Sequence, residues 1–307
     1  MDYSVLAFYC LTPIEDPFLE VARHKEFLAS RDFRCRIYIS ERGINGQASG
    51  SHADAQSYMD WLHADPRFAH VSFKIHYASE QAFPKTTVKY RRQLVAIDCD
   101  VDLSERGEHI SPEEWKKMLE QKEEGTLLLD VRNDYEWEVG HFEGAELPKL
   151  DTFRQFPRYA KELKERCDPA KTPVMMYCTG GIRCEFYSAV LKKEGFEKVY
   201  QLDGGVIQYG LDKGSEHWEG KLFVFDDRLV VPVGEDNTTI GHCLHCSTPN
   251  DVYYNCANMD CNKLFLCCLS CLREHKGCCC EACLTQGRVR PYTENAKPFR
   301  KQPRENS

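Results

Sequence analysis

The feature that most constrains the fold is a glycine loop between a buried apolar run and a helical pattern. The apolar run is Pro173–Tyr177, the loop is Cys178–Arg183, and the helical pattern begins at Cys184. Two glycines let backbone amides turn inward, and the N-terminus of a helix stabilises a negatively charged atom close to it. The pattern therefore predicts that Cys178 ends a buried strand and is ionised near neutral pH.

The number of residues between the cysteine and the arginine limits which ligands the loop can hold. Four residues separate Cys178 from Arg183, whereas the loops that cradle phosphate in tyrosine and dual-specificity phosphatases need five. The shorter loop suits a sulfur atom or a flat base edge better than a tetrahedral anion. On the hexapeptide alone, a buried cysteine before a glycine turn stays the alternative interpretation. The intervening active-site loop residues are Thr179, Gly180, Gly181 and Ile182.

Apolar runs and helical stretches alternate around the loop. Leu127–Leu129 and Val174–Met176 are typical of buried parallel strands, and helical stretches separate them. This alternation predicts a parallel sheet covered by helices, with a ligand beyond the carboxyl ends of its strands. Asp130 and Cys178 emerge at that edge. We expect Asp130 and Arg132 to form a structural ion pair, with support of the active site as their alternative role.

Three motifs together resemble the rhodanese (sulfurtransferase) domain. The first spans Thr126–Arg132 and continues to Pro148, the second is the Cys178 loop, and the third is Tyr200–Val206. They occur in the order of that family. The resemblance implies a rhodanese domain over about residues 108–215. Glu136 and His141, which follow the strand that ends at Asp130, are further candidates to surround the cysteine at the carboxyl edge of the sheet.

Seventeen cysteines are the second constraint, and eleven of them fall between Cys243 and Cys283. The chain has no run of eighteen apolar residues and no basic signal region, so we expect a cytoplasmic protein without a membrane span. A reducing compartment disfavours disulfides and leaves metal binding or catalysis as the usual uses of cysteine. The spacing predicts structural zinc sites. The expected ligands are Cys243, Cys246, Cys256, Cys261, Cys268, Cys271, Cys279 and Cys283.

The spacing leaves two ligand arrangements open. If the pairs interleave, Cys243 and Cys246 join Cys268 and Cys271, while Cys256 and Cys261 join Cys283 and one cysteine of the run 278–280. A consecutive arrangement is equally allowed, and a cysteine-rich segment without metal is the alternative to both.

The first hundred residues show a βαββαβ order, which is that of the ferredoxin-like split unit. A further extended stretch, Thr86–Ile97, is expected to continue the sheet. Small domains of this fold bind RNA on the open sheet face, where Phe8, Tyr38 and Tyr77 are candidates to stack on bases. A core role is the alternative for each aromatic.

Charge bears on the partners of the chain. The formal net charge is −8, which opposes general affinity for nucleic acid, although local patches matter more than the sum. A basic, flexible tail is expected over residues 286–307, and a solvated edge strand and disordered tail are the alternative interpretations. Weak candidates for RNA phosphate contacts are Lys85, Lys89, Arg91 and Arg92.

These patterns predict an α/β multidomain chain. We expect a ferredoxin-like (acylphosphatase-like) α+β domain over 1–100, a rhodanese α/β domain with a parallel sheet over 108–215, and a connector with a cysteine-rich zinc-type module over 216–285. The connector should contain a short hairpin built from Phe223–Phe225 and Leu229–Val233.

Over nearly its whole length the chain resembles the bacterial rhodanese-domain tRNA uridine hydroxylases, the TrhO family. The resemblance rests on Glu41–Gly46, Val131–Glu143, Tyr177–Glu185 and the cysteine module with Lys276–Cys279. It implies oxygen-dependent hydroxylation at C5 of the wobble uridine in the tRNA anticodon, giving 5-hydroxyuridine. Cys178 would be the essential cysteine, O2 the co-substrate and the electron donor unknown. No flavin or nicotinamide motif is seen, and no obligate protein partner is inferred.

Our hypothesis is that the Cys178 thiolate adds to C6 of uracil and activates C5, while Arg183 and the loop amides stabilise the enolate. Cys184 is a candidate to resolve an oxidised Cys178, although a buried small residue is the favoured interpretation. The alternatives are a thiosulfate-type sulfurtransferase with a Cys178 persulfide, and a zinc-dependent RNA or protein adaptor without catalysis.

Overall fold

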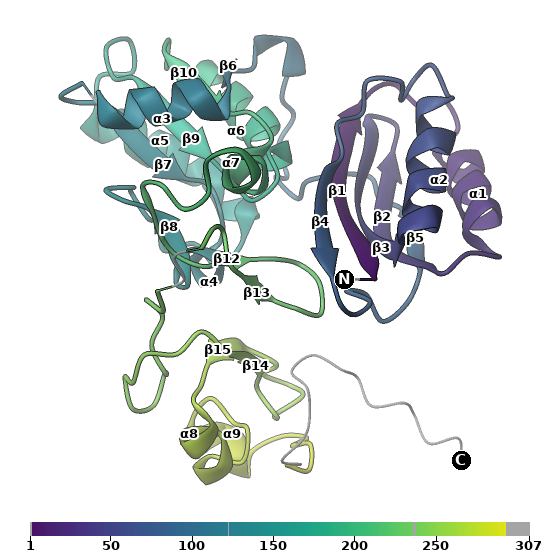
Figure 1. The fold of residues 1–307 in the computed structure, drawn as a ribbon. Helices are drawn as coiled ribbons and strands as arrows, with labels where there is room; N and C mark the ends of the chain where they lie inside the picture. Colours follow the sequence, from purple (N-terminus) through teal and green to yellow (C-terminus); the bar gives the residue numbers. More distant parts are fainter. Residues whose placement is uncertain (1, 122, 236–237, 293–307) are drawn as a thin grey trace.

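The computed structural model describes residues 2–121, 123–235 and 238–292. The described chain forms an N-terminal unit, a central unit beside it and a small C-terminal unit (Figure 1). Within these ranges no helix is both long and apolar enough to cross a membrane. Most of the basic tail predicted for 286–307 lies outside the described residues, which end at 292.

The N-terminal unit is a five-stranded sheet with the order β4-β1-β3-β2-β5 and two helices on one face (Figure 1). Its neighbouring strands are antiparallel except β2 and β5, which are parallel. This is the predicted ferredoxin-like order with one added strand. The elements are β1 Tyr3–Leu11, α1 Pro17–Leu28, β2 Phe33–Ser40, β3 Gly43–Ser51, α2 His52–His63, β4 Lys74–Ala78 and β5 Thr87–Tyr90.

The added strand is shorter than predicted, because β5 ends at Tyr90. Leu94, Val95 and Ile97 instead enter the buried core of the central unit. Burying an aliphatic side chain of this kind contributes roughly 1.5–3 kcal/mol to folding, which favours the path into the central core. The prediction of an extended stretch to Ile97 is therefore wrong beyond Tyr90. The residues that follow Tyr90 instead connect the N-terminal sheet to the core of the central unit.

Side-chain alternation gives the N-terminal sheet two different faces. Phe8 is only 2% exposed and packs in the core under α1 and α2, where it lies opposite Gly46. Tyr77 contacts His52, the first residue of α2. Phe8 and Tyr77 thus do not lie on the open face, because that face is set by strand parity. Tyr9 lies one residue from Phe8 and packs against the central core.

The central unit is a parallel sheet of order β6-β10-β9-β7 between two helical layers, as predicted. Along β9, Val174 and Met176 belong to the core under α5 and α6, and Met175 and Tyr177 to the core under α3 and α7. Both faces are covered, so this strand is continuously apolar. The elements are β6 Glu108–Ile110, α3 Pro112–Glu120, β7 Leu127–Asp130, α4 Asp134–Trp137, β8 Gly140–Phe142, α5 Phe156–Arg166, β9 Val174–Tyr177, α6 Ile182–Lys193, β10 Val199–Leu202 and α7 Gly205–Lys213, with short 3-10 turns η1 Leu103–Glu105 and η2 Phe153–Gln155.

The connector returns along the central unit before the chain enters the C-terminal unit. Strand β11 (Trp218–Gly220) pairs with β8, and β12 (Leu222–Phe223) pairs with β13 (Val230–Val231). The second pairing is the predicted hairpin in a shorter form.

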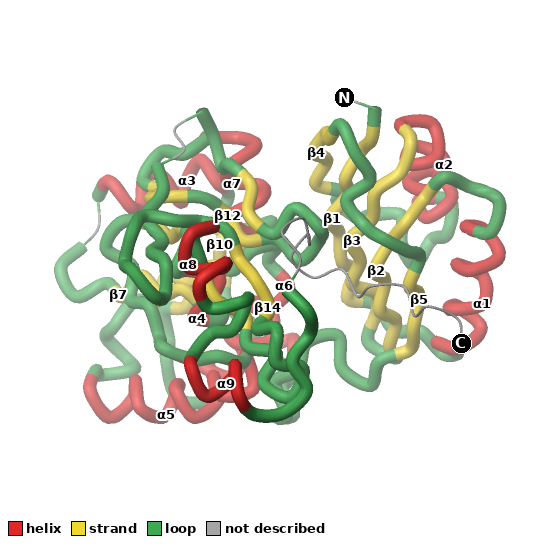
Figure 2. The backbone as a smooth tube through the Cα atoms, turned by 90° about the horizontal axis from the view of Figure 1, so that it is seen from below, coloured by secondary structure: helices red, strands yellow, loops and turns green. Residues whose placement is uncertain are grey.

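The C-terminal unit lies under the central unit in Figure 1, and the view from below shows it in front of that unit and away from α1 (Figure 2). It contains the hairpin β14 (Tyr253–Asn255) and β15 (Leu264–Leu266), followed by α8 (Leu269–Glu274) and α9 (Glu281–Thr285). Cysteines make up most of its buried cluster. Since so small a unit buries little apolar surface, metal binding would have to supply much of its stability.

Candidate active site and metal centres

Cys178 lies at the carboxyl end of β9, where the chain turns into α6. Its Sγ accepts a hydrogen bond of 3.1 Å from the backbone N–H of Gly181. Gly181 has φ +99°, and a Cβ added to it would lie 3.2 Å from the hydroxyl oxygen of Tyr9. Glycine is therefore required here both by the backbone conformation and by the space.

The surroundings of Cys178 lower its pKa to about 5. Burial of the thiol opposes ionisation. The hydrogen bond from the Cys184 thiol, the positive charge of Arg183 and two backbone N–H groups outweigh that effect. Burial and the Cys178 sulfur together raise the pKa of Cys184 well above its usual value. At neutral pH Cys178 is thus a thiolate held by a neutral thiol donor.

Arg183 is held in place by Glu136, a fully buried residue of α4. Its two terminal nitrogens contact the two carboxylate oxygens at 2.5 Å and 2.7 Å, and the Thr179 hydroxyl donates to the same carboxylate at 3.0 Å. Such a bidentate pair fixes the guanidinium. Arg183 consequently acts on Cys178 through its charge.

Asp130 and Arg132 form a separate buried ion pair at 2.5 Å, and neither side chain is exposed. Arg132 also donates to the carbonyl oxygens of Gly140 and Glu136. The pair thereby ties strand β7 to the segment around α4. His141 contacts Glu219 at 3.7 Å on the strand that pairs with its own. Asp130, Arg132 and His141 brace the elements around the loop and do not line the cleft that Cys178 faces.

That cleft, of about 400 Å³, lies between the Cys178 loop and the open face of the N-terminal sheet. The sheet contributes polar side chains, and the central unit contributes the loop and apolar walls. Such a cavity, apolar with a few placed polar groups, is typical of a ligand site. The polar lining from the sheet consists of Tyr9, Arg36, Tyr38, Asn45 and Gln47.

Two residues of the N-terminal sheet that sequence reasoning missed contact the loop region. Lys74 is only 4% exposed, and its ammonium donates to the carbonyl oxygen of Gly180 at 3.1 Å. The Tyr9 hydroxyl donates to Glu185 at 2.7 Å, and His109 contacts the same carboxylate oxygen at 2.9 Å. One sequence cannot reveal such contacts, because the partners of Lys74 and Tyr9 lie in the other unit, more than a hundred residues along the chain.

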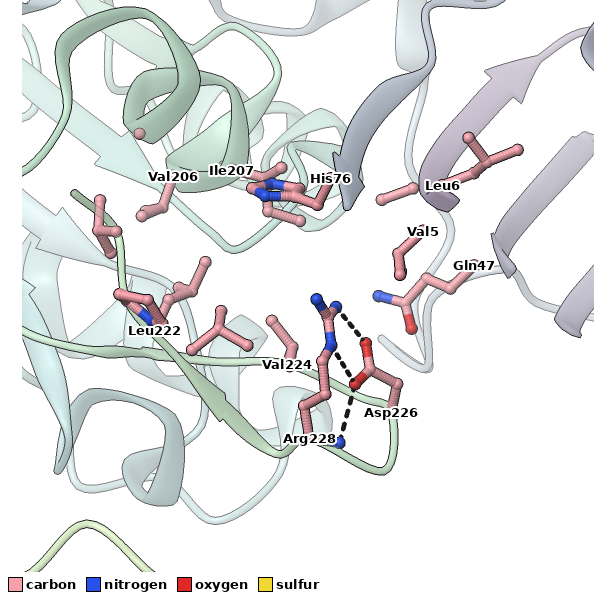
Figure 3. Close-up of a pocket in the computed structure, with 15 residues that line it drawn as sticks. Val5, Leu6, Gln47, His76, Val206, Ile207, Leu222, Val224, Asp226 and Arg228 are labelled. Atoms are coloured by element: carbon pink, nitrogen blue, oxygen red, sulfur yellow. Dashed lines mark hydrogen bonds and ion pairs between the residues drawn. The ribbon is translucent and has the colours of Figure 1, made fainter. Parts of the chain in front are cut away.

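A smaller cavity lies at the same interface between the N-terminal and central units (Figure 3). It measures about 30 Å³ and lies between Val5 of the sheet and Ile207 of α7, with the ion pair of Asp226 and Arg228 at its edge. This volume holds about one or two water molecules. It is a packing gap and too small for a substrate.

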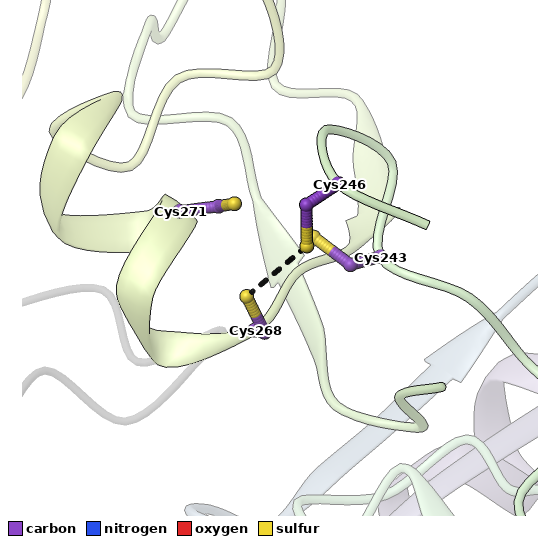
Figure 4. Close-up of side chains that lie close together, drawn as sticks. All are labelled: Cys243, Cys246, Cys268 and Cys271. Carbon is purple, nitrogen blue, oxygen red and sulfur yellow. Dashed lines mark hydrogen bonds between the residues drawn. The ribbon is translucent and has the colours of Figure 1, made fainter. Parts of the chain in front are cut away.

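Two sets of four cysteines lie close together in the C-terminal unit. In each set the four Sγ atoms all lie within 4.8 Å of one another. The sets follow the interleaved arrangement, which excludes the consecutive one in this fold. The first set is Cys243, Cys246, Cys268 and Cys271 (Figure 4), and the second is Cys256, Cys261, Cys279 and Cys283.

The geometry of both sets fits a tetrahedral metal ion. Four thiolates around zinc at about 2.3 Å give sulfur–sulfur edges of about 3.8 Å. The Cys246–Cys268 and Cys261–Cys279 distances are both 3.7 Å. Among the described cysteines of this unit, Cys267, Cys278 and Cys280 belong to neither set. Both sets can therefore hold a metal ion with a closed shell of cysteine ligands.

Three family models match successive parts of the chain. Residues 3–94 match the UPF0176 acylphosphatase like domain, residues 111–210 the rhodanese-like domain, and residues 219–284 the rhodanase C-terminal region. Among solved structures, the chain is similar to the rhodanese-like domain of an Anabaena protein, with 22% identity, a TM-score of 0.31 and coverage of 42% of this chain and 88% of that one.

Curated relatives match nearly the whole chain. One is the tRNA uridine(34) hydroxylase of Protochlamydia amoebophila (strain UWE25), which is 60% identical over 97% of this chain and 94% of its own length. Proteins of the same name from Chlamydia pneumoniae and Chlamydia abortus are 55% and 56% identical, over 97% and 98% of this chain and 93% of their own lengths.

Proposed function

The chain belongs to the family of the tRNA uridine(34) hydroxylases, and from that premise we propose that it hydroxylates C5 of the wobble uridine of tRNA to give 5-hydroxyuridine. The observation that carries this proposal is the cleft that the Cys178 thiolate shares with the open face of a second domain. An enzyme that modifies a base must take the base out of its stack and enclose it, which a cleft between two units allows.

In the proposed reaction the Cys178 thiolate adds to C6 of uracil, and the negative charge passes to C5 and O4. C5 takes one oxygen atom of O2, and the other leaves as water with two electrons and two protons from an external reductant, for which thiols are a suitable class. C5 then loses its proton, and the thiolate leaves C6 to restore the double bond. Uridine, O2, two electrons and two protons thus give 5-hydroxyuridine and water.

The cleft contains groups that can stabilise the negative charge that develops on O4 of uracil. The terminal nitrogens of Arg183 are engaged by Glu136, so its guanidinium contributes a positive charge near the thiolate. The carboxamides of Asn45 and Gln47 line the cleft and make no hydrogen bond to other described residues. We assign direct hydrogen bonds to uracil to these amides, since both offer a donor for a carbonyl oxygen.

The remaining parts of the chain support this site. The Tyr253 hydroxyl of the C-terminal unit donates to the Tyr135 carbonyl oxygen at 2.5 Å, directly before Glu136. Structural zinc in the two cysteine sets would hold that unit against α4. A tRNA substrate bound through its anticodon region implies a cytoplasmic enzyme, and the proposed reaction requires no protein partner.

The competing reaction is sulfur transfer through a persulfide on Cys178. Sulfur transfer would use the same loop, but it would not require the carboxamide groups that the N-terminal sheet places in the cleft. The names of the relatives do not favour it, nor do they favour an adaptor without catalysis, which would not need an ionised Cys178.

The test is nucleoside mass spectrometry of unmodified tRNA incubated with the full chain, air and a thiol reductant. We expect uridine 34 to gain one oxygen atom, and the gain to disappear without O2 or with Cys178→Ser. Cys167→Ser is the matched control, because Cys167 lies at the end of α5, outside the cleft. Thiocyanate release from thiosulfate and cyanide, with no oxygen gain, would assign the chain to sulfur transfer instead.

A further inference from the structure

A second hollow of about 650 Å³ opens directly beside the cleft. Tyr38, Leu94 and Ala96 line both spaces, so the two adjoin each other. Its walls come from both units, since Arg91 and Arg92 follow β5 and Arg154 lies in η2 of the central unit. We call this hollow the flanking groove.

The flanking groove is electropositive in an acidic chain. The whole chain carries a net charge of −8, whereas the groove is lined by three arginines and two aspartates. Arg154 is paired with Asp98. Arg91 and Arg92 are exposed and form no ion pair with the described residues. Asp100 also lines the groove, so the lining carries a formal charge of +1, and the two exposed guanidinium groups are left to meet a ligand. Guanidinium is well suited to bidentate contact with phosphate.

Tyr38 lies at the junction of the two spaces. Its ring is half-buried on the open sheet face, and the Arg91 guanidinium lies over it at 5.1 Å from the ring centre. An aromatic ring beside arginines is the usual platform on which proteins stack an unpaired base while holding its phosphates.

We propose that the flanking groove binds the nucleotide next to the target uridine in the anticodon loop, with its base against Tyr38 and its phosphates on Arg91 and Arg92. This inference rests on the proposed function. If the base of the target uridine occupies the cleft, the next nucleotide of the RNA chain must lie directly beside the cleft. The flanking groove is the hollow that adjoins the cleft through shared walls. Its occupant is single-stranded, since a paired base could not turn toward Tyr38.

The experiment measures binding of the full chain to a fluorescent RNA hairpin that carries the anticodon loop, across a series of salt concentrations. The variants are Arg91→Gln with Arg92→Gln, Tyr38→Ala and Tyr38→Phe. The control is Arg158→Gln, an arginine of α5 with 86% of its side chain exposed. Circular dichroism of each variant confirms that it is folded.

We expect the double arginine variant to bind more weakly and to reduce the slope of log affinity against log salt by about two, one for each lost phosphate contact. Tyr38→Ala should weaken binding by roughly 5- to 100-fold, the range for one lost stacked base, and Tyr38→Phe should retain it. In hydroxylation assays the arginine variants should raise KM more than they lower kcat.

Two outcomes would overturn the groove assignment. One is an arginine variant with the affinity and salt slope of Arg158→Gln, and the other is equal weakening on a duplex RNA of the same length, which would show general attraction only. Failure of the proposed function looks different. The wild-type chain would then add no oxygen to tRNA, while the groove variants would still weaken binding of the hairpin.

Discussion

Several groups distinguish Cys178 from an ordinary buried cysteine, and the thiol of Cys184 is one of them. The Cys184 thiol is the foremost of the groups that lower the pKa of Cys178 against the effect of burial. Cys184 follows directly on Arg183, so the first turn of α6 delivers a hydrogen bond and a positive charge together. Cys184 therefore acts as a positioning residue for the thiolate in this fold.

The first prediction follows from that contact. Cys184→Ala should raise the pKa of Cys178 from about 5 toward the ordinary thiol value, because burial remains and a hydrogen bond is lost. The thiolate form of wild-type Cys178 is lost as pH falls through about 5, so its alkylation should be fast above that pH. The measurement is iodoacetamide labelling of Cys178 against pH by mass spectrometry. An unchanged midpoint in Cys184→Ala, with Cys167→Ala as the control, would contradict it.

Glu136 gives the second prediction at this scale. Removing it by Glu136→Ala leaves the Arg183 guanidinium buried without its partner, which should destabilise the protein by about 3–5 kcal/mol. Urea unfolding measures the loss, and Glu136→Ala with Arg183→Met should recover part of it. The control is Glu162→Ala, whose partner Arg158 is exposed and whose loss should have little effect. Equal stability of the two single variants would contradict the prediction.

At the scale of elements, one glycine determines how β1 and β3 pack under the helices. A Cβ at Gly46 would lie 2.3 Å from the ring of Phe8. The ring cannot retreat, because Tyr58 and Phe73 contact its other sides. Gly46, the second glycine of the motif Glu41–Gly46, is therefore explained by packing against Phe8.

Gly46→Ala should destabilise the protein by about 1–3 kcal/mol, the usual range for overpacking a filled core. Replacing the ring as well, by Phe8→Leu, should recover part of that loss, since the added methyl group would occupy the vacated space. Gly180→Ala serves as the control, because nothing lies within 4 Å of a Cβ there. Urea unfolding of the three variants checks the prediction, and it fails if Gly46→Ala is as stable as the wild type.

Elements and their order could be predicted from the sequence because their patterns are local. The apolar runs of β7 and β9 and the glycines of the loop carry their own periodicity and turn signals. The docking of the two units could not be predicted, because Lys74 and Tyr9 look like ordinary strand residues until the central unit covers them. The end of β5 was missed for the same reason.

At the scale of the whole molecule, the three units meet around the Cys178 loop. The N-terminal sheet holds the Gly180 carbonyl oxygen through Lys74. The central unit fixes Arg183 through Glu136. The C-terminal unit contacts Tyr135, the residue directly before Glu136. A change in the cysteine module can therefore reach the cleft through α4, without any contact between the module and substrate.

The interleaved cysteine sets give the last prediction. Cys246 and Cys268 belong to one set, so Cys246→Ala with Cys268→Ala should abolish one metal ion and keep the other. A consecutive arrangement would place these two residues in different sites and lose both ions. The measurement is zinc per chain by plasma mass spectrometry.

The neighbouring residue Cys267 provides the matched control. It is buried and belongs to neither set, so Cys267→Ala should retain both ions. Removing all metal with a chelator should unfold the C-terminal unit, because its buried cluster consists mainly of cysteines. The Tyr253–Tyr135 hydrogen bond would then be lost, and limited proteolysis should cut the chain after the connector. A chelated protein as resistant to protease as the metal-bound one would show that the cysteine core holds without metal.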